Sequence, residues 1–221
     1  MPSCRSPCAR CDTRAVTDPD CAQMHGPQAD RWMEHWLPAM RAAAAGTPVL
    51  ELGCDTGGDT AWLLAQGFEV IGTDIAEDAL RRCSVAAPRA ALLLHDLRQP
   101  MPFADASFGV VVASLCLHYF DWHTTVAAVA EIRRCLRPGG LLLCRVNSTN
   151  DVDHGAMQGT EVEPHYFRQD AHYADFKRFF DAADLDRLFT PAAWTEVNRE
   201  ERQVLRYAKP KMAWEQVLRR T

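Results

Sequence analysis

The sequence has no apolar run long enough to cross a membrane. The longest, Phe108–Cys116, falls well short of the roughly 20 residues that a bilayer-spanning helix needs. The first residues, MPSCRSPCARC, also lack the apolar core of a secretory signal peptide. We therefore expect a cytoplasmic protein with no membrane partner, in which the nine cysteines stay reduced.

An excess of positive charge is also missing. The chain has 24 basic and 29 acidic residues, which gives a net charge of −5. Surfaces that bind nucleic acids are usually basic, so we expect no nucleic-acid partner. The composition, 48% hydrophobic and 24% charged over 221 residues, is typical of one globular domain with a sizeable core.

Residues 1–27 differ from the rest because they hold few large apolar side chains. Cys4, Cys8 and Cys11 have a spacing that can hold an iron–sulfur cluster, and Cys21 could complete a four-thiolate zinc site. The cysteine pairs lack the usual zinc spacing, and nothing after them supports a cluster enzyme. We predict a disordered tail over residues 1–27, a single domain over residues 28–221 and no metal site. A metal-binding N-terminal module stays open as an alternative.

The stretch Val49–Thr60, VLELGCDTGGDT, organises the chain. Its first residues have the apolar pattern of a strand buried in a parallel sheet, and its glycines allow a sharp turn. The helix expected from Asp59 directs its free N–H groups back at that turn. This arrangement typically holds a nucleotide-like ligand at the end of a strand.

Two acidic residues narrow the choice of ligand. Asp74 ends the apolar run 68–73, where a carboxylate can accept from both hydroxyls of a ribose. Glu51 lies beside the glycine turn, and Asp55 replaces the middle glycine of a G-x-G-x-x-G pattern. Carboxylates repel a pyrophosphate, which disfavours a nicotinamide-dependent oxidoreductase, whereas they suit a sulfonium ligand with an amino-acid tail.

At this point the chain resembles the class I methyltransferases that use S-adenosylmethionine. ELGCDTGG and VIGTDIA resemble the first two family motifs, and the likeness continues through residues 95–120, HDLRQPMPFADASFGVVVASLCLHYF, and 131–147, EIRRCLRPGGLLLCRVN. The layout also resembles small bacterial methyltransferases of the tellurite and thiopurine type. The resemblance implies an α/β doubly wound, mostly parallel sheet of seven strands with an antiparallel last hairpin. It also implies methyl transfer to a small-molecule acceptor by direct in-line displacement.

The resemblance also suggests which residues bind S-adenosylmethionine. Asp74 would bind the ribose, and Asp96 would accept from the adenine amino group, although Asp96 could instead cap a turn. The full set of expected cofactor residues is Glu51, Gly53, Gly57, Asp59, Asp74, Ile75, Asp96, Leu97 and Ser114.

The acceptor is expected between three segments that lie beside the cofactor in the family. A helix over residues 28–45 supplies Trp32, the segment after residue 114 supplies Tyr119, and a polar insert over 147–178 supplies His165 and Tyr166. His118 is the candidate general base, because an imidazole can take a proton near neutral pH. It could equally be a packing histidine. The acceptor atom and the oligomeric state stay open.

Hydrophobic periodicity predicts the remaining elements. Helices are expected over 59–66, 77–86, 124–136 and 184–189, and strands over 90–94, 108–114 and 141–146. An antiparallel pair over 193–198 and 203–208 and a short helix over 214–219 would end the chain. A methyltransferase-like protein that only binds the cofactor is the main functional alternative, because Asp55 departs from the family pattern.

Overall fold

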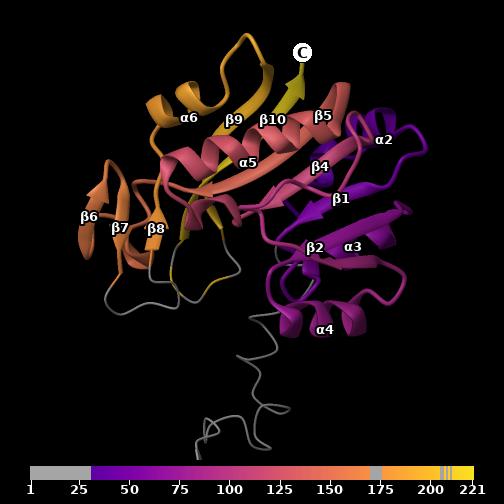
Figure 1. Ribbon diagram of the computed structural model, residues 1–221, viewed down its shortest axis with the longest axis horizontal. Coiled ribbons are helices and arrows are strands. Elements are labelled where there is room, and N and C mark those ends of the chain that lie inside the picture. Colours follow the sequence, from indigo (N-terminus) through magenta and orange to yellow (C-terminus); the bar gives the residue numbers. More distant parts are fainter. Residues whose placement is uncertain (1–30, 170–175, 205–206, 208, 210) are drawn as a thin grey trace, which may run out of the picture.

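The computed structural model describes residues 31–169, 176–204, 207, 209 and 211–221 (Figure 1). The tail expected over residues 1–27, with Cys4, Cys8, Cys11 and Cys21, lies outside these ranges. Within them, no helix is both long and apolar enough to span a bilayer.

The centre of the molecule is a seven-stranded sheet with the order β3-β2-β1-β4-β5-β10-β9 (Figure 1). Its strands are β1 Val49–Leu52, β2 Val70–Asp74, β3 Ala91–Leu94, β4 Phe108–Ser114, β5 Leu136–Asn147, β9 Trp194–Val204 and β10 Lys211–Arg220. β1 to β5 are parallel, and β10 runs antiparallel to both β5 and β9. The predicted doubly wound sheet with an antiparallel last hairpin is confirmed.

The end of the chain differs from the prediction in two ways. Residues 214–219, expected as a helix, belong to β10 and pair with β5. The expected break between residues 198 and 203 is missing, since β9 continues to Val204. β10 buries side chains on both faces of the sheet, among them Val217 and Leu218. Such a short run has no alternation that would distinguish a strand from a helix.

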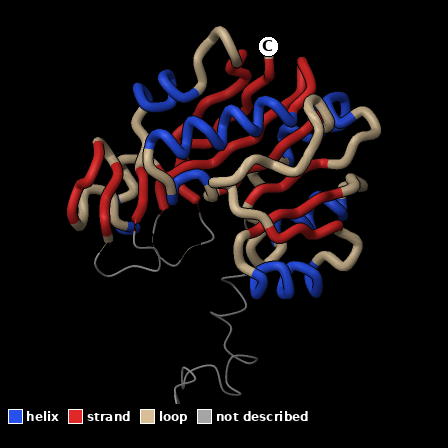
Figure 2. The backbone as a smooth tube through the Cα atoms, in the orientation of Figure 1, coloured by secondary structure: helices blue, strands red, loops and turns tan. Residues whose placement is uncertain are grey.

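Helices cover both faces of the sheet (Figure 2). The 3-10 turn η1 Glu34–Trp36 leads into α2 Leu37–Ala44, which packs with α3 Gly58–Ala65 on one face, and α4 Glu77–Ala86 lies beside α3. α5 Trp122–Cys135 and α6 Ala182–Leu188 cover the other face. β4 therefore contacts apolar side chains on both sides, with Val110 in one core cluster and Val111 in the other. This burial on both faces explains why β4 is apolar along its whole length, which is the pattern from which the sequence predicts a central strand.

Residues of the predicted insert form a separate three-stranded sheet at one end of the molecule (Figure 1). After the 3-10 turn η3 Val152–His154, its strands are β6 Thr160–Glu163, β7 Tyr166–Arg168 and β8 Phe176–Arg178, all antiparallel. The polar insert expected over 147–178 carried no prediction of its secondary structure. The strands are very short, and β6 is largely exposed, so they carry little hydrophobic pattern.

Candidate active site

A cavity of about 730 Å³ lies at the carboxyl ends of β1, β2 and β3 and beside the segment that follows β4. This edge of an open parallel sheet is where such folds bind ligands, and the volume suits a small molecule. Five expected cofactor residues line one side of it: Gly53, Asp74, Ile75, Asp96 and Leu97.

The glycine loop borders the cavity with three residues in left-handed backbone conformations. Gly53, Asp55 and Gly57 have φ values of 67°, 45° and 86°. A Cβ at Gly53 would lie 2.6 Å from the Cβ of Cys116, so this position requires glycine. Asp55 adopts the conformation that glycine favours, which a short polar side chain tolerates better than most others. The departure from the family pattern therefore leaves the turn intact.

The carboxylate of Asp74 is oriented by two backbone donors. Its Oδ2 accepts from the N–H of Asp55 at 3.0 Å, and its Oδ1 accepts from the N–H of Ala76 at 2.9 Å. These bonds connect the glycine loop to the end of β2. Ile75, which is 59% exposed, lies next to the carboxylate and offers an apolar surface to the cavity.

Asp96 pairs with Arg98, a cavity residue that the sequence analysis did not single out. Arg98 lies 2.7 Å from the carboxylate through Nη2, and its Nε and backbone N–H also donate to it. These bonds lower the pKa of Asp96 below its usual value. Asp96 is therefore ionised near neutral pH. Each carboxylate oxygen has more than one acceptor site, which leaves capacity for a ligand donor.

The other expected cofactor residues do not line this cavity. The buried carboxylate of Glu51 accepts from Oγ1 of Thr60 at 2.5 Å. Asp59 accepts from Nε1 of Trp32 at 3.4 Å, and the guanidinium of Arg145 lies 4.4 Å from the Trp32 ring centroid. Trp32, predicted as an acceptor residue, is thus held beside the first turn of α3.

Two further expected cofactor residues lie in the sheet and loop framework. A Cβ on Gly57 would lie 3.0 Å from Cα of Cys83, so this glycine lets the loop pack closely against α4. The buried Oγ of Ser114 has no hydrogen-bond partner among the residues that the structure describes. Their predicted contact with the cofactor stays a prediction.

The opposite wall of the cavity is largely aromatic. Tyr119 and Phe120 follow β4 in and after the 3-10 turn η2 Leu117–Tyr119, while Tyr166 and Phe176 come from β7 and β8. Sequence reasoning predicted Tyr119 and Tyr166. It placed the segments of His95 and Cys116 at this edge without giving either residue a role, and it missed Phe120, Phe176, Thr73, Asp121 and Thr124. Asp121 had a recognisable signal, because an acid three residues before Thr124 is a typical helix N-cap.

His118 packs against the wall residue Tyr119, with ring centroids 4.2 Å apart. Its side chain is 4% exposed and does not line the cavity. Burial, reinforced by the charges of Lys211 and Lys177, holds its pKa well below the usual value, so the ring is neutral at pH 7. A general base must reach the proton it removes. His118 lies beside the cavity without lining it, and its predicted catalytic role stays a prediction.

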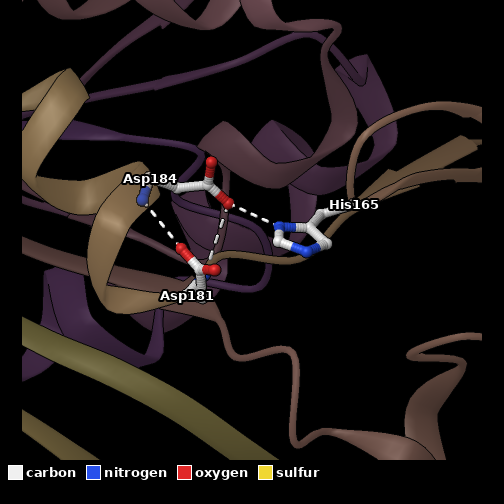
Figure 3. Close-up of side chains that lie close together, drawn as sticks. All are labelled: His165, Asp181 and Asp184. Atoms are coloured by element: carbon white, nitrogen blue, oxygen red, sulfur yellow. Dashed lines mark hydrogen bonds and ion pairs between the residues drawn. The ribbon is translucent and has the colours of Figure 1, made fainter.

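His165 does not line this cavity either. Its Nδ1 lies 2.7 Å from Oδ2 of Asp184, and it lines a second cavity of about 460 Å³. Figure 3 shows the contact between these two side chains. Asp184 and Asp181 form the capping box of α6, in which each carboxylate accepts from the other residue's backbone N–H. The three side chains offer atoms within 4.8 Å of one another. The capping box already accounts for the position of both carboxylates.

Comparison with known proteins supports the family suggested by the motifs. Residues 49–140 match the family model described as a methyltransferase domain. An uncharacterized methyltransferase of Synechocystis is 32% identical over 108 residues, which are 48% of this chain and 50% of that protein. A 23S rRNA (guanine(748)-N(1))-methyltransferase of Streptomyces fradiae is 36% identical over 109 residues, 48% of this chain and 36% of that protein. The chain thus spans half or less of the length of these relatives.

A solved structure shows the same fold over most of the chain. The 1,6-didemethyltoxoflavin-N1-methyltransferase of Burkholderia thailandensis, solved with 1,6-didemethyltoxoflavin and S-adenosylhomocysteine, aligns with a TM-score of 0.60. The two sequences are 23% identical, and the alignment covers 86% of this chain and 82% of the other. By its family match over residues 49–140 and its sheet topology, the chain is similar to methyltransferase domains and has the fold of this S-adenosylhomocysteine-bound structure.

Proposed function

We propose that the protein transfers a methyl group from S-adenosylmethionine to a small-molecule acceptor. One observation carries the proposal: a single cavity joins the expected cofactor residues at the strand ends to an aromatic wall that can hold an acceptor. The family match over residues 49–140 supports it.

The residues on the strand side of the cavity fit the parts of the cofactor. Asp74, held by two backbone N–H groups, would accept from the ribose hydroxyls. Asp96 would accept from the adenine amino group, and Ile75 and Leu97 would contact the adenine ring from their apolar side chains. Glu51 and Asp59, beside the glycine loop, would place carboxylate oxygens near the ammonium group of the cofactor's amino-acid end.

The chemistry requires little of the protein beyond binding and alignment. When bound, S-adenosylmethionine supplies an activated methyl group on a good leaving group. Most of the rate enhancement would come from holding the acceptor atom in line and close, which can remove several kcal/mol of the barrier, on the order of 7–11 in the best model systems. No side chain acting as general base is part of the proposal, because His118 does not reach the cavity.

A small molecule suits this chain better than an RNA. The Streptomyces relative acts on 23S rRNA, and the Burkholderia enzyme on a small heterocycle. The net charge of −5 disfavours the phosphate contacts that dominate RNA binding. The cavity itself has the size of a small-molecule site.

Calorimetry with S-adenosylhomocysteine tests the cofactor assignment. Asp74→Asn removes the charge and one acceptor oxygen at the ribose position, so affinity should fall at least about tenfold, which is roughly 1.4 kcal/mol. Asp153→Asn, an exposed carboxylate outside the cavity, is the matched control and should leave affinity unchanged. Equal affinity of wild type and Asp74→Asn for S-adenosylhomocysteine would show that the cofactor does not bind at Asp74. Binding of NADH in place of S-adenosylhomocysteine would favour an oxidoreductase.

Turnover needs a separate measurement. Incubation of the protein and methyl-labelled S-adenosylmethionine with fractionated small-molecule extract should transfer label to a discrete product. Tight cofactor binding with no labelled product from any extract would support the alternative of a non-catalytic binding protein.

A further inference from the structure

The far wall of the cavity offers ring surfaces from separate parts of the chain. Tyr119 follows β4, whereas Tyr166 and Phe176 come from β7 and β8 of the insert. Tyr119 is 39% exposed and Phe176 is 37% exposed, so apolar ring surface remains uncovered there. Such surfaces favour flat apolar ligands, because aromatic rings stack on one another with additional stabilisation beyond simple burial.

The rings are held in position by their neighbours. Tyr166 and Phe176 stack with centroids 5.5 Å apart and ring planes 25° from parallel. The Tyr166 hydroxyl donates to the carbonyl of Tyr119 at 3.2 Å, which joins the two sides of the wall. The guanidinium of Arg178, 4.9 Å from the Tyr166 centroid, supports the ring without lining the cavity. A ligand would therefore meet a wall that is already ordered, at a smaller entropic cost.

Negatively charged side chains outnumber positively charged ones in the described lining of the cavity. Three carboxylates line it, those of Asp74, Asp96 and Asp121. The described lining includes one guanidinium and no lysine, and that guanidinium, of Arg98, is already paired with Asp96. His95 is the other basic side chain of this described lining. A negatively charged acceptor would thus meet an excess of like charge.

Of the three carboxylates, Asp121 is the one next to the aromatic wall, because it directly follows Tyr119 and Phe120 in the sequence. Its Oδ1 accepts from the N–H of Thr124 at 2.7 Å and caps α5. This bond is the main cause of a lowered Asp121 pKa, so the group carries its charge near neutral pH. Arg178 adds little positive charge to this end, since it is paired with Glu163.

We infer that the acceptor is a planar aromatic compound that is neutral or carries a basic nitrogen, held by the Tyr119, Tyr166 and Phe176 rings and oriented by Asp121. This inference rests on the proposed function, because it assigns the acceptor end of the same cavity. It narrows the acceptor by shape and by charge, and both can be tested without knowing the natural compound.

Binding of small probes to the full chain tests both properties. Three probes share a phenol ring and differ in charge: tyramine is positive, 4-ethylphenol is neutral and 3-(4-hydroxyphenyl)propionate is negative. A fourth probe, 4-ethylcyclohexanol, is the saturated analogue of 4-ethylphenol. Dissociation constants come from ligand-observed NMR with S-adenosylhomocysteine saturating. Tyramine should bind at least about tenfold tighter than the propionate, and 4-ethylphenol tighter than 4-ethylcyclohexanol.

Two variants test the aromatic contact and the charge of Asp121 separately. Phe176→Leu should weaken every aromatic probe. Asp121→Asn keeps an effective helix cap but removes the charge, so it should reduce the preference for tyramine over the propionate severalfold. Asp153→Asn, outside the cavity, should leave that preference unchanged.

Three results would overturn the inference while S-adenosylhomocysteine still binds. They are equal or tighter binding of the propionate, equal binding of the saturated analogue, and no binding of any probe at millimolar concentration. Loss of S-adenosylhomocysteine binding in the wild type would instead reject the proposed function. The two failures are therefore distinguishable in one set of samples.

Discussion

Arg178 joins the insert to the rest of the domain, and its removal should loosen that connection. The side chain is 2% exposed. Its Nε donates to the carbonyl of Phe120 at 3.1 Å, its Nη1 donates to the carbonyl of Pro164 at 3.1 Å, and Nη2 pairs with Glu163. Glu163 in turn accepts from the N–H of Trp122 at 3.0 Å, at the start of α5.

The cost of Arg178→Met follows from these contacts. Hydrogen bonds to a charged group contribute about 1.5–3 kcal/mol each, and the carbonyls of Phe120 and Pro164 would lose theirs. The ion pair adds less, because Glu163 is 39% exposed and water can replace its partner. Methionine keeps most of the apolar packing. We expect a loss of about 3 kcal/mol in the free energy of unfolding, which lowers the melting temperature of a domain of this size by roughly 6–12 °C.

Thermal and urea unfolding followed by circular dichroism measure the effect. Arg81→Met is the matched control, since Arg81 is 68% exposed and makes only surface pairs on α4. It should change stability by less than about 0.5 kcal/mol. Arg178→Lys should recover little, because an ammonium cannot reproduce the planar fork.

The same variant should affect the two ends of the cavity unequally. Tyr166 and Phe176 depend on the insert, whereas Asp74 ends β2 and Asp96 follows β3 of the main sheet. Probe binding should therefore weaken more than S-adenosylhomocysteine binding. An unchanged melting temperature for Arg178→Met, or equal losses at both ends, would refute this account of the insert.

Three smaller predictions concern the loop and the buried titratable groups. Asp55→Gly relieves a left-handed backbone and keeps the N–H bond to Asp74, so calorimetry should show S-adenosylhomocysteine affinity within about threefold, roughly 0.6 kcal/mol; strong binding created from none would favour the non-catalytic alternative. Burial raises the pKa of the Cys116 thiol well above its usual value and that of Cys144 to about 12, so peptide mass spectrometry should find both unalkylated after iodoacetamide at pH 8, unless the fold opens. The pKa of His118 is depressed in the folded state, so the unfolded state binds more protons and the free energy of unfolding falls as the pH drops below 6.5. His118→Gln should flatten this decline in urea titrations between pH 7 and 5. An unaltered slope would contradict a buried, neutral His118.

The main sheet could be predicted because its signals are local and repeated. A glycine turn after a buried strand, an acid at the end of the next strand and an uninterrupted apolar strand each indicate a parallel α/β unit. Gly53, Asp74 and Asp96 reach one cavity because all three follow strands of a parallel sheet, whose carboxyl ends share one edge. Knowledge of the strands was therefore enough to place these residues together.

The sequence does not indicate in which direction each side chain of a short turn points. His118 and Tyr119 are adjacent in η2 and their rings pack 4.2 Å apart, yet His118 is buried and Tyr119 lines the cavity. The motif predicts that this segment follows β4. It does not determine which of the two neighbours is exposed to the cavity, because that depends on the segments that cover the turn.

The insert shows the same limit at the acceptor end. His165 and Tyr166 are consecutive, but His165 has a φ of 60° and its ring contacts Asp184, whereas Tyr166 begins β7 and faces the cavity. A shift of one residue at a strand start exchanges the faces, and the pairing with β6 and β8 determines the register. Phe176 reaches the wall through that pairing. The proposed acceptor end is thus assembled by contacts between distant segments, which explains why the sequence motifs indicate a methyl donor and leave the acceptor open.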